Sequence, residues 1–470
     1  MSTEYEPVIG LEIHVQLKTR TKMFCGCELS FGEEPNTRTC PVCLGLPGTL
    51  PVANAQAVIF GMMMGLALGC EIAPRSIFHR KNYFYPDLAK GYQISQYDIP
   101  LCRGGRLGDV RIHRIHLEED AAKLVHVGES GRIHGSDASI VDYNRGGTPL
   151  AEIVTEPDIH SAEQARDWLQ LLRETLRQLG VSDVNMEEGS LRCDANVSIR
   201  PKGTTALGTK TELKNMNSFR FVMQGINAEI ARQTAILEAG GQVEQETLHF
   251  DPVSGRLSSL RSKEEAHDYR YFPEPDLVPL VPTPEMLETA RAAIPELPAD
   301  RQARYEREFS LSEDDARLFA FEPVWGQYFE RVAAETSNPA ANWVKELRTR
   351  VDTDPADSPV VPGALAKLVD LAAARTVTAG SARTVLDRMV ETGEDPAEIA
   401  AAEGLTVMED SGELSQIVAK VILDNPDIVE RIRGGNAKAM GALVGPVMRE
   451  TKGRADGGEV NRLLREQLGV

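Results

Sequence analysis

The sequence predicts an α+β protein in which strands and helices share about the first 270 residues and helices form the rest. Residues Val8–Leu17 alternate between apolar and polar side chains, which is typical of a half-buried strand. The segment Leu191–Arg200 repeats this alternation and predicts a second strand of the same kind. From Arg301 to about Gly404, Ala, Leu, Glu and Arg recur at helical spacing, which indicates a helical region.

The clearest single helix is predicted to begin after Ser161. Ser161-Ala-Glu-Gln164 has the form of a capping box, in which the serine and the glutamine satisfy free amides of the first turn. Gly180 is placed to end the helix, because glycine readily adopts the left-handed conformation found there. The side chains expected to face the core are Trp168, Leu172, Leu176 and Leu179.

A proline-rich segment is predicted to mark the end of the first domain. Pro273–Pro298 contains seven prolines, so we expect neither a helix nor a central strand there. Beyond about Leu405, short helices are expected, separated by Gly434-Gly435 and Gly457-Gly458. The predicted domains are residues 1–295, 296–404 and 405–470.

Composition places the chain among soluble globular proteins. Its 470 residues exceed one ordinary core, and 42% apolar and 26% charged residues are usual for that class. The best apolar run, Ala57–Leu68, is too short for a membrane span, and Met1–Pro7 lacks the regions of a signal peptide. We therefore expect a cytoplasmic protein with reduced cysteines and no membrane partner.

The charge is unevenly distributed. A net charge of −19 argues against a protein whose whole surface binds nucleic acid. Residues Arg431–Val470 nevertheless contain eight Lys or Arg against four acids, which gives +4. A basic tail on an acidic body suits contact with a polyanion at one end. A solvated helical surface is the alternative, and composition alone favours it.

Two cysteine pairs predict a metal site. Cys25-Gly-Cys27 and Cys40-Pro-Val-Cys43 gather four of the seven cysteines within nineteen residues. Four thiolates from two turns can surround Zn²⁺ tetrahedrally, which leaves no open position and makes such a site structural. The pattern favours zinc over free thiols, although the first pair is C-x-C rather than the commoner C-x-x-C. The other cysteines, Cys70, Cys102 and Cys193, are expected to be ordinary buried thiols.

Acidic residues recur on one face of several predicted strands. If those strands share a sheet with a concave face, the carboxylates converge and a divalent cation is the natural way to neutralise them. Mg²⁺ held by carboxylates, with Lys and Arg at the rim, is suited to phosphoryl transfer. For any one acid a surface salt bridge is the better explanation, and only the whole set favours a site. The set is Glu12 with His14, Glu118 with Glu119, Glu152, Asp194 beside Arg192, and Glu212 between Lys210 and Lys214.

Other motifs narrow the possible functions. The sequence has neither a P-loop nor a kinase glycine-rich loop, so nucleotide binding needs another architecture. It also lacks a Ser/His/Asp pattern or an amidase-like segment, which argues against glutamine hydrolysis on this chain. Arg80–Pro86, Tyr92–Tyr97 and Asp268–Pro275 mix cations with aromatic residues. They would form either a base-stacking surface or ordinary core, and the residues alone leave both open.

Long strings of the sequence resemble the B-subunit of the aspartyl/glutamyl-tRNA amidotransferase family. The likeness runs essentially from end to end. It is carried by Val8–Val15, Arg80–Asp87, Tyr92–Gln96, His116–Asp120, Gly147–Leu150, Glu156–Asp158, Glu187–Asp194, Glu212–Asn215, Asp268–Asp276, Lys438–Gly441, Leu443–Gly445 and Lys452-Gly453.

The resemblance implies a glutamine-synthetase-like cradle, a helical domain and a small tail domain that contacts tRNA. It implies a heterotrimer with an amidase subunit, which releases ammonia from glutamine, and a small subunit. The cognate aminoacyl-tRNA synthetase is a further partner to consider. In this family ATP phosphorylates the side-chain carboxylate of Glu or Asp on a misacylated tRNA, and ammonia then displaces phosphate.

The resemblance also implies roles for individual residues. The Mg²⁺ ligands and catalytic residues would come from Glu12, His14, Glu118, Glu119, Glu152 and Asp194. The nucleotide or channel region would include Glu187, Arg192, Lys210, Glu212 and Lys214. A structural zinc would be held by Cys25, Cys27, Cys40 and Cys43.

Two other functions stay open on the sequence. The chain could be a tRNA-binding scaffold whose active centre lies wholly on partner chains, and the basic tail suits that equally well. It could also be a stand-alone ligase for a small acid, which the basic tail disfavours.

Overall fold

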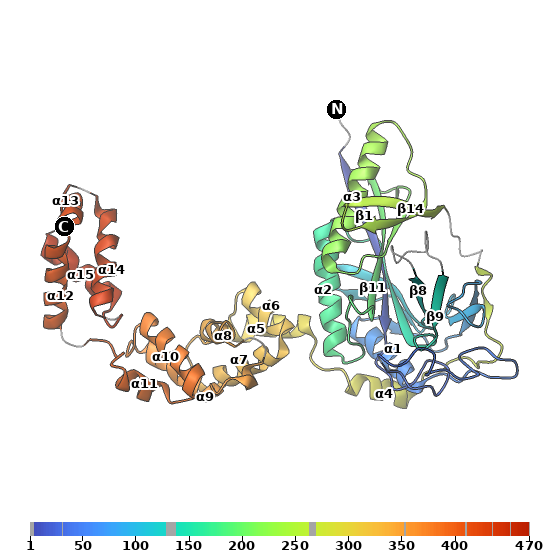
Figure 1. The fold of residues 1–470 in the computed structure, drawn as a ribbon, viewed down its shortest axis with the longest axis horizontal. Helices are drawn as coiled ribbons and strands as arrows, with labels where there is room; N and C mark the ends of the chain where they lie inside the picture. The colour runs from blue at the N-terminus through green and yellow to red at the C-terminus, as the bar shows by residue number, and fades with distance from the viewer. Residues whose placement is uncertain are drawn as a thin grey trace. The chain divides into compact units, whose positions relative to one another are not determined.

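The computed structural model describes residues 4–30, 32–127, 138–262, 269–351, 354–408, 411–434, 436–451 and 453–469. The chain forms two units, Met1–Ala299 and Asp300–Val470 (Figure 1). The first unit is mixed α/β and the second is helical. None of the helices in the described part of the chain has the length and hydropathy needed to span a bilayer.

The first unit is built on a large mixed sheet with the order β14-β13-β12-β11-β1-β10-β7-β5-β2, and β6 pairs with β7 at its edge. Only β12 and β13 run parallel among these pairs. The strands are β1 (Tyr5–Gln16), β2 (Glu71–Ile72), β5 (Cys102–Arg103), β6 (Arg106–Leu107), β7 (Val110–Glu119), β10 (Pro149–Thr155), β11 (Leu191–Pro201), β12 (Thr211–Lys214), β13 (Glu246–Asp251) and β14 (Arg256–Ser262).

The alternating sequence of β1 and β11 explains why this sheet has two different faces. Ile9, Leu11 and Ile13 are buried in the core, whereas the side chains between them point the other way. The two predicted strands, Val8–Leu17 and Leu191–Arg200, are therefore confirmed to within a few residues.

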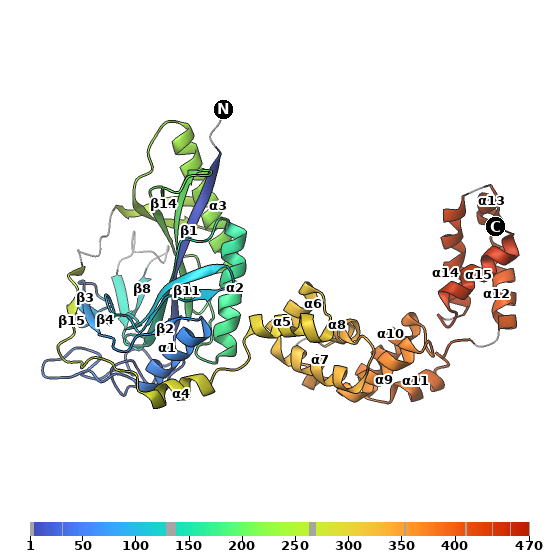
Figure 2. The ribbon, with the colours of Figure 1, turned by 180° about the vertical axis from the view of Figure 1, so that it is seen from behind.

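Helices cover the apolar face of the sheet (Figures 1 and 2). They are α1 (Ala55–Ala67), α2 (Ala162–Gln178) and α3 (Phe219–Glu238), and α4 (Pro284–Ala292) packs on α1. The predicted helix is confirmed as α2, since the Ser161 side chain accepts a hydrogen bond from the Gln164 amide at 3.0 Å. Its inward residues, Trp168, Leu172, Leu176 and Leu179, are buried.

Two small sheets lie beside the large one. One has the order β15-β3-β4, with β15 (Phe272–Pro273), β3 (His79–Asn82) and β4 (Tyr92–Ser95). The other pairs β8 (Lys123–Val127) with β9 (Ala138–Asp142). Figure 1 shows the paired strands β8 and β9 on the side of the large sheet opposite α2 and α3.

Two expectations about helices were wrong. The proline-rich segment contains the helix α4, because Pro284 occupies its first position, where the missing N–H costs nothing. Gly457-Gly458 does not separate helices but opens one. The Asp456 side chain caps that helix by accepting a hydrogen bond from the Glu459 amide at 2.9 Å. Gly434 does end a helix, as expected.

The second unit consists of helices, as predicted from Arg301 onward. One hydrophobic cluster spans residues 305 to 405 and another spans residues 414 to 468. The helices are α5 (Pro298–Phe309), α6 (Glu313–Phe321), α7 (Pro323–Glu335), α8 (Ala341–Arg348), α9 (Pro362–Ala373), α10 (Ala379–Thr392), α11 (Pro396–Ala402), α12 (Ser411–Asp424), α13 (Pro426–Arg433), α14 (Gly441–Glu450) and α15 (Gly457–Leu468), with 3-10 turns at Pro355–Asp357 and Ala437–Met440. Asp268, Gly435 and Lys452 from the sequence motifs lie outside the described residues, as does the side chain of Lys438.

Candidate active site

The acidic residues meet on the open face of the large sheet because the strand register aligns them. Glu12 on β1 lies opposite Asp194 on β11. His14 lies opposite Glu152 on β10, which in turn lies opposite His116 on β7. A row of ionisable side chains thus crosses four neighbouring strands at the middle of the sheet.

Glu12, Glu152 and His116 of this row line a cavity of about 330 Å³. His14 and Asp194 lie beside this lining, where they contact Glu152 and Lys214. Both acidic and basic side chains line this cavity, which agrees with the carboxylate site and basic rim predicted from the sequence. The ionisable lining residues are Glu12, Lys81, Arg114, His116, Glu118, Glu152, Lys210, Glu212, Lys214 and Glu246.

His14 is held between carboxylates. Its Nε2 lies 3.4 Å from a Glu152 oxygen and 3.7 Å from a Glu12 oxygen. Burial alone would lower the pKa of His14, but the hydrogen bond and charge of Glu152, together with the charges of Glu118 and Glu12, outweigh burial and raise the pKa to about 9. The imidazole therefore carries the proton that the surrounding carboxylates need for neutralisation.

The carboxylates themselves differ in pKa. Burial, followed by the charge of Glu152, raises the pKa of Glu12 to about 7. Glu152 is buried as well, but the charge of His116 and the hydrogen bond from His14 hold its pKa well below the usual range. Groups whose pKa values are pushed apart in this way are typical of functional sites.

Cations balance the acids at the β12 edge of the cavity. The Lys214 Nζ lies 2.9 Å from an Asp194 oxygen and 3.0 Å from a Glu212 oxygen. Burial works against this charge, but Asp194 and Glu212 raise the pKa of Lys214. Arg114 lies 3.5 Å from Glu152 on the other side.

Two overlapping groups could hold a divalent cation. The ligand atoms of Glu12, His14 and Asp194 lie within 4.8 Å of one another, and so do those of His14, Glu118 and Glu152. Carboxylate oxygens are the ligands that Mg²⁺ prefers, so the donor set fits this ion. Since both groups include His14, a cation in either would replace the proton that His14 carries.

Besides His14 and Asp194, three further predicted residues are absent from the cavity lining. Glu119 points to the opposite side of β7, where its side chain pairs with Lys90 and lines a second cavity of about 200 Å³. Arg192 donates a hydrogen bond to buried Asp120 at 2.9 Å. Glu187 is exposed in the turn before β11.

Sequence reasoning did not include His116 among the site residues, although His116 lines the cavity. His116 shares a face of β7 with Glu118, and the alternation of a strand could have indicated it. Tyr97, Tyr269 and Tyr271 belong to two segments for which the sequence left a base-stacking surface and ordinary core both open. The segments are about 170 residues apart, and the fold brings these tyrosines to the same cavity. Lys81 on β3 lies over the ring of Tyr269 at 4.8 Å.

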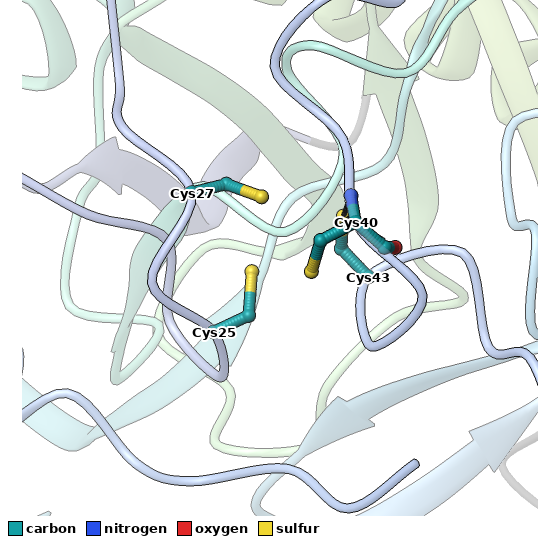
Figure 3. A group of neighbouring side chains, drawn as sticks. All are labelled: Cys25, Cys27, Cys40 and Cys43. Atoms are coloured by element: carbon teal, nitrogen blue, oxygen red, sulfur yellow. Dashed lines mark hydrogen bonds between the residues drawn. The ribbon is translucent and has the colours of Figure 1, made fainter. Parts of the chain in front are cut away.

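The four cysteines of the predicted zinc site converge (Figure 3). The sulfur atoms of Cys25, Cys27, Cys40 and Cys43 lie within 4.8 Å of one another. Tetrahedral Zn²⁺ with bonds of about 2.3 Å requires sulfurs about 3.8 Å apart, which this group can reach with small side-chain movements. The hydrogen bond from Cys25 is the main cause that lowers the pKa of the Cys43 thiol to about 4. Cys70, Cys102 and Cys193 are buried, as predicted.

Both units match known protein families. Residues 7–288 match the model of the GatB/GatE catalytic domain, and residues 327–468 match that of the GatB domain. The chain belongs to the GatB family of aspartyl/glutamyl-tRNA(Asn/Gln) amidotransferase subunits. The resemblance seen in the sequence is thereby confirmed.

Relatives that carry the name of this amidotransferase B-subunit match along their whole length. The relative from Geobacter sulfurreducens is 50% identical, with 99% of each chain covered. That of Frankia casuarinae is also 50% identical, covering 99% of this chain and 96% of the relative. That of Carboxydothermus hydrogenoformans is 49% identical, with 99% of each covered. The match to the catalytic-domain model contains the whole acid-lined cavity.

Proposed function

We propose that this chain is the ATP-using subunit of a glutamine-dependent amidotransferase, which converts Glu-tRNA(Gln), Asp-tRNA(Asn) or both into the amidated forms. The observation that carries the proposal is the cavity on the open face of the sheet, where carboxylates and lysines converge within a chain of the GatB family. Binding tRNA as a scaffold does not by itself require such a buried cluster of ionisable groups.

The chemistry explains why the site is charged. A side-chain carboxylate resists attack by ammonia because its leaving group would be oxide. Transfer of the γ-phosphoryl group of ATP to a carboxylate oxygen releases ADP and gives an acyl phosphate. Ammonia then attacks the carbonyl carbon, phosphate leaves with the bonding electrons, and the nitrogen loses a proton to give the amide.

Residues of the cavity divide into two roles in this proposal. Glu12, His14 and Asp194, together with Glu118 and Glu152, would hold Mg²⁺. A bound Mg²⁺ supplies charge neutralisation for the triphosphate. Lys210 and Lys214 are placed to bind phosphate oxygens at the β12 edge, and Glu212 orients Lys214 through their ion pair. Arg192, Glu187 and Glu119 have no such role, because they lie away from the cavity.

The remaining assignments also form part of the proposal. The large sheet serves as a glutamine-synthetase-like cradle, and three hydrophobic clusters support domains at residues 1–295, 296–404 and 405–470. The four-cysteine group holds a structural zinc. The chain works in the cytoplasm with an amidase subunit and a small subunit, and its tail domain contacts tRNA.

Substitutions in the cavity test the proposal. Glu12→Gln removes a carboxylate that lines the cavity, and Asp194→Asn removes one beside it, with little change in side-chain volume. In the assembled enzyme with Glu-tRNA, ammonia and γ-labelled ATP, both should reduce labelled phosphate release by at least about 100-fold. Glu187→Gln is the matched control, because it removes an exposed carboxylate outside the cavity, and it should leave the rate unchanged. Full activity of folded Glu12→Gln and Asp194→Asn proteins, with weaker tRNA binding alone, would instead favour the scaffold function.

A further inference from the structure

Three tyrosines form one side of the active-site cavity, and the proposed phosphoryl chemistry gives them no role. We refer to Tyr97, Tyr269 and Tyr271 as the tyrosine wall. The rings of Tyr97 and Tyr271 are stacked, with centroids 4.4 Å apart and planes inclined by 11°. Tyr269 meets Tyr271 edge to face at 6.2 Å. All three line the cavity.

The wall is held rigidly by the small sheet β15-β3-β4. Tyr97 follows β4 and Tyr271 precedes β15, and both of these strands pair with β3. The guanidinium of Arg80 on β3 donates hydrogen bonds of 2.6 and 2.8 Å to the buried carboxylate of Glu274, which fixes the segment after Tyr271. Such a framework keeps the rings in place before a ligand arrives, which lowers the entropy cost of binding.

The aromatic rings of Tyr97 and Tyr271, rather than their hydroxyl groups, are the parts of these side chains that could bind a ligand. Within the described residues, the hydroxyls of Tyr97 and Tyr271 form no hydrogen bond, so these side chains are not anchored as buried tyrosines usually are. Tyr97 is 47% exposed although Tyr271 covers one of its faces. Both members of the stacked pair line the cavity and Tyr97 keeps part of its surface exposed, so the pair is accessible to a planar ligand.

We propose that the tyrosine wall is a stacking platform for an adenine ring, which binds beside the Tyr97–Tyr271 pair while the charged groups of the same ligand reach the acidic side chains of the cavity. This inference rests on the proposed function, because the proposed reaction uses two substrates that contain adenine: ATP and the aminoacyl-tRNA, which ends in a 3′-terminal adenosine. Both must bring a reacting group to the carboxylates, and both carry the same flat base. Stacking on tyrosine needs no hydrogen-bond pattern, so the shared chemistry is the adenine face itself.

Alanine, leucine and phenylalanine variants of Tyr97 and Tyr271 test the platform. We would measure the KM for ATP at saturating Glu-tRNA and the KM for Glu-tRNA at saturating ATP in the assembled enzyme. A stacked base contributes about 1–3 kcal/mol, so Tyr97→Ala or Tyr271→Ala should raise one KM by about 5- to 150-fold. The KM that rises identifies the ligand as ATP or as the tRNA end. Tyr97→Phe and Tyr271→Phe keep the ring and should stay within about twofold of the unmodified enzyme.

Two controls keep the result decisive. Tyr85 is 46% exposed and lies outside the cavity lining, so Tyr85→Ala should change neither KM. If an alanine variant does not fold, Tyr97→Leu keeps most of the side-chain volume but lacks the aromatic face, and it should show the same loss. Unchanged KM values for both ligands in folded Tyr97 and Tyr271 variants, or equal losses in the phenylalanine variants, would overturn the platform.

If the unmodified enzyme hydrolyses no ATP with Glu-tRNA, it is the proposed function that fails. Equilibrium binding of ATP and of tRNA to the same variants then tests the platform by itself.

Discussion

The buried lysine beside the four cysteines offers a quantitative test of the proposed zinc site. Lys22 is only 1% exposed, and its Nζ lies 3.7 Å from the Cys43 sulfur and 3.0 Å from the carbonyl oxygen of Tyr143. Lys22 forms no ion pair with a carboxylate among the described residues. Its ammonium is buried at a cost that only a nearby anion can offset, and the Cys43 thiolate is the anion in contact with it.

The expected effect of Lys22→Met follows from this contact. Four thiolates around Zn²⁺ leave a net charge of −2, which one ammonium reduces to −1. A hydrogen bond to a charged group contributes about 1.5–3 kcal/mol, so its loss should weaken zinc binding by about 10- to 100-fold. Methionine fills a similar volume, so the surrounding packing should change little.

Competition with a chromogenic chelator measures this loss directly and does not depend on enzyme activity. Lys18→Met is the matched control, because Lys18 lies on the same segment and pairs with Asp183 at the exposed surface. Lys22→Arg keeps the charge and should fall between the two. If folded Lys22→Met released zinc at the same chelator concentration as the unmodified protein, Lys22 would not stabilise the thiolates.

Three further predictions concern stability and tRNA binding. Gly147 has φ +91°, and a Cβ added there would lie 3.3 Å from the Lys22 side chain. Urea unfolding of Gly147→Ala should therefore show a free energy of unfolding lowered by about 1–3 kcal/mol. Gly363→Ala is the control and should be nearly neutral, because nothing lies within 4 Å of a Cβ added at Gly363. Asp120 is buried, but Arg192 and Arg145 outweigh burial and lower its pKa, so it stabilises the fold above its unfolded pKa of about 3.8. Asp120→Asn should therefore destabilise the protein at pH 7, and urea unfolding should show this difference shrinking as the pH falls below 3.8. Removing the residues after Leu405 should raise the KM for tRNA and leave the KM for ATP unchanged; an unaltered tRNA KM would contradict the role of the tail.

The sequence by itself determined the elements whose signals are local. Alternation predicts β1 and β11, because side chains of a strand point to opposite faces at every second residue. The serine cap and the apolar spacing predict α2 for the same kind of reason. The convergence of the four cysteines could also be predicted, since both pairs lie on one short segment and need no distant partner to meet.

Only the tertiary structure decided which acids share a site. Glu118 and Glu119 are neighbours in the sequence, yet the pleat of β7 sends the first into the acidic cavity and the second into another. The pairing register of β1 with β10 and β11 brings His14 to Glu152 and Glu12 to Asp194, and no local pattern encodes that register. The tyrosine wall depends on the same long-range pairing, because β4 and β15 meet only through β3.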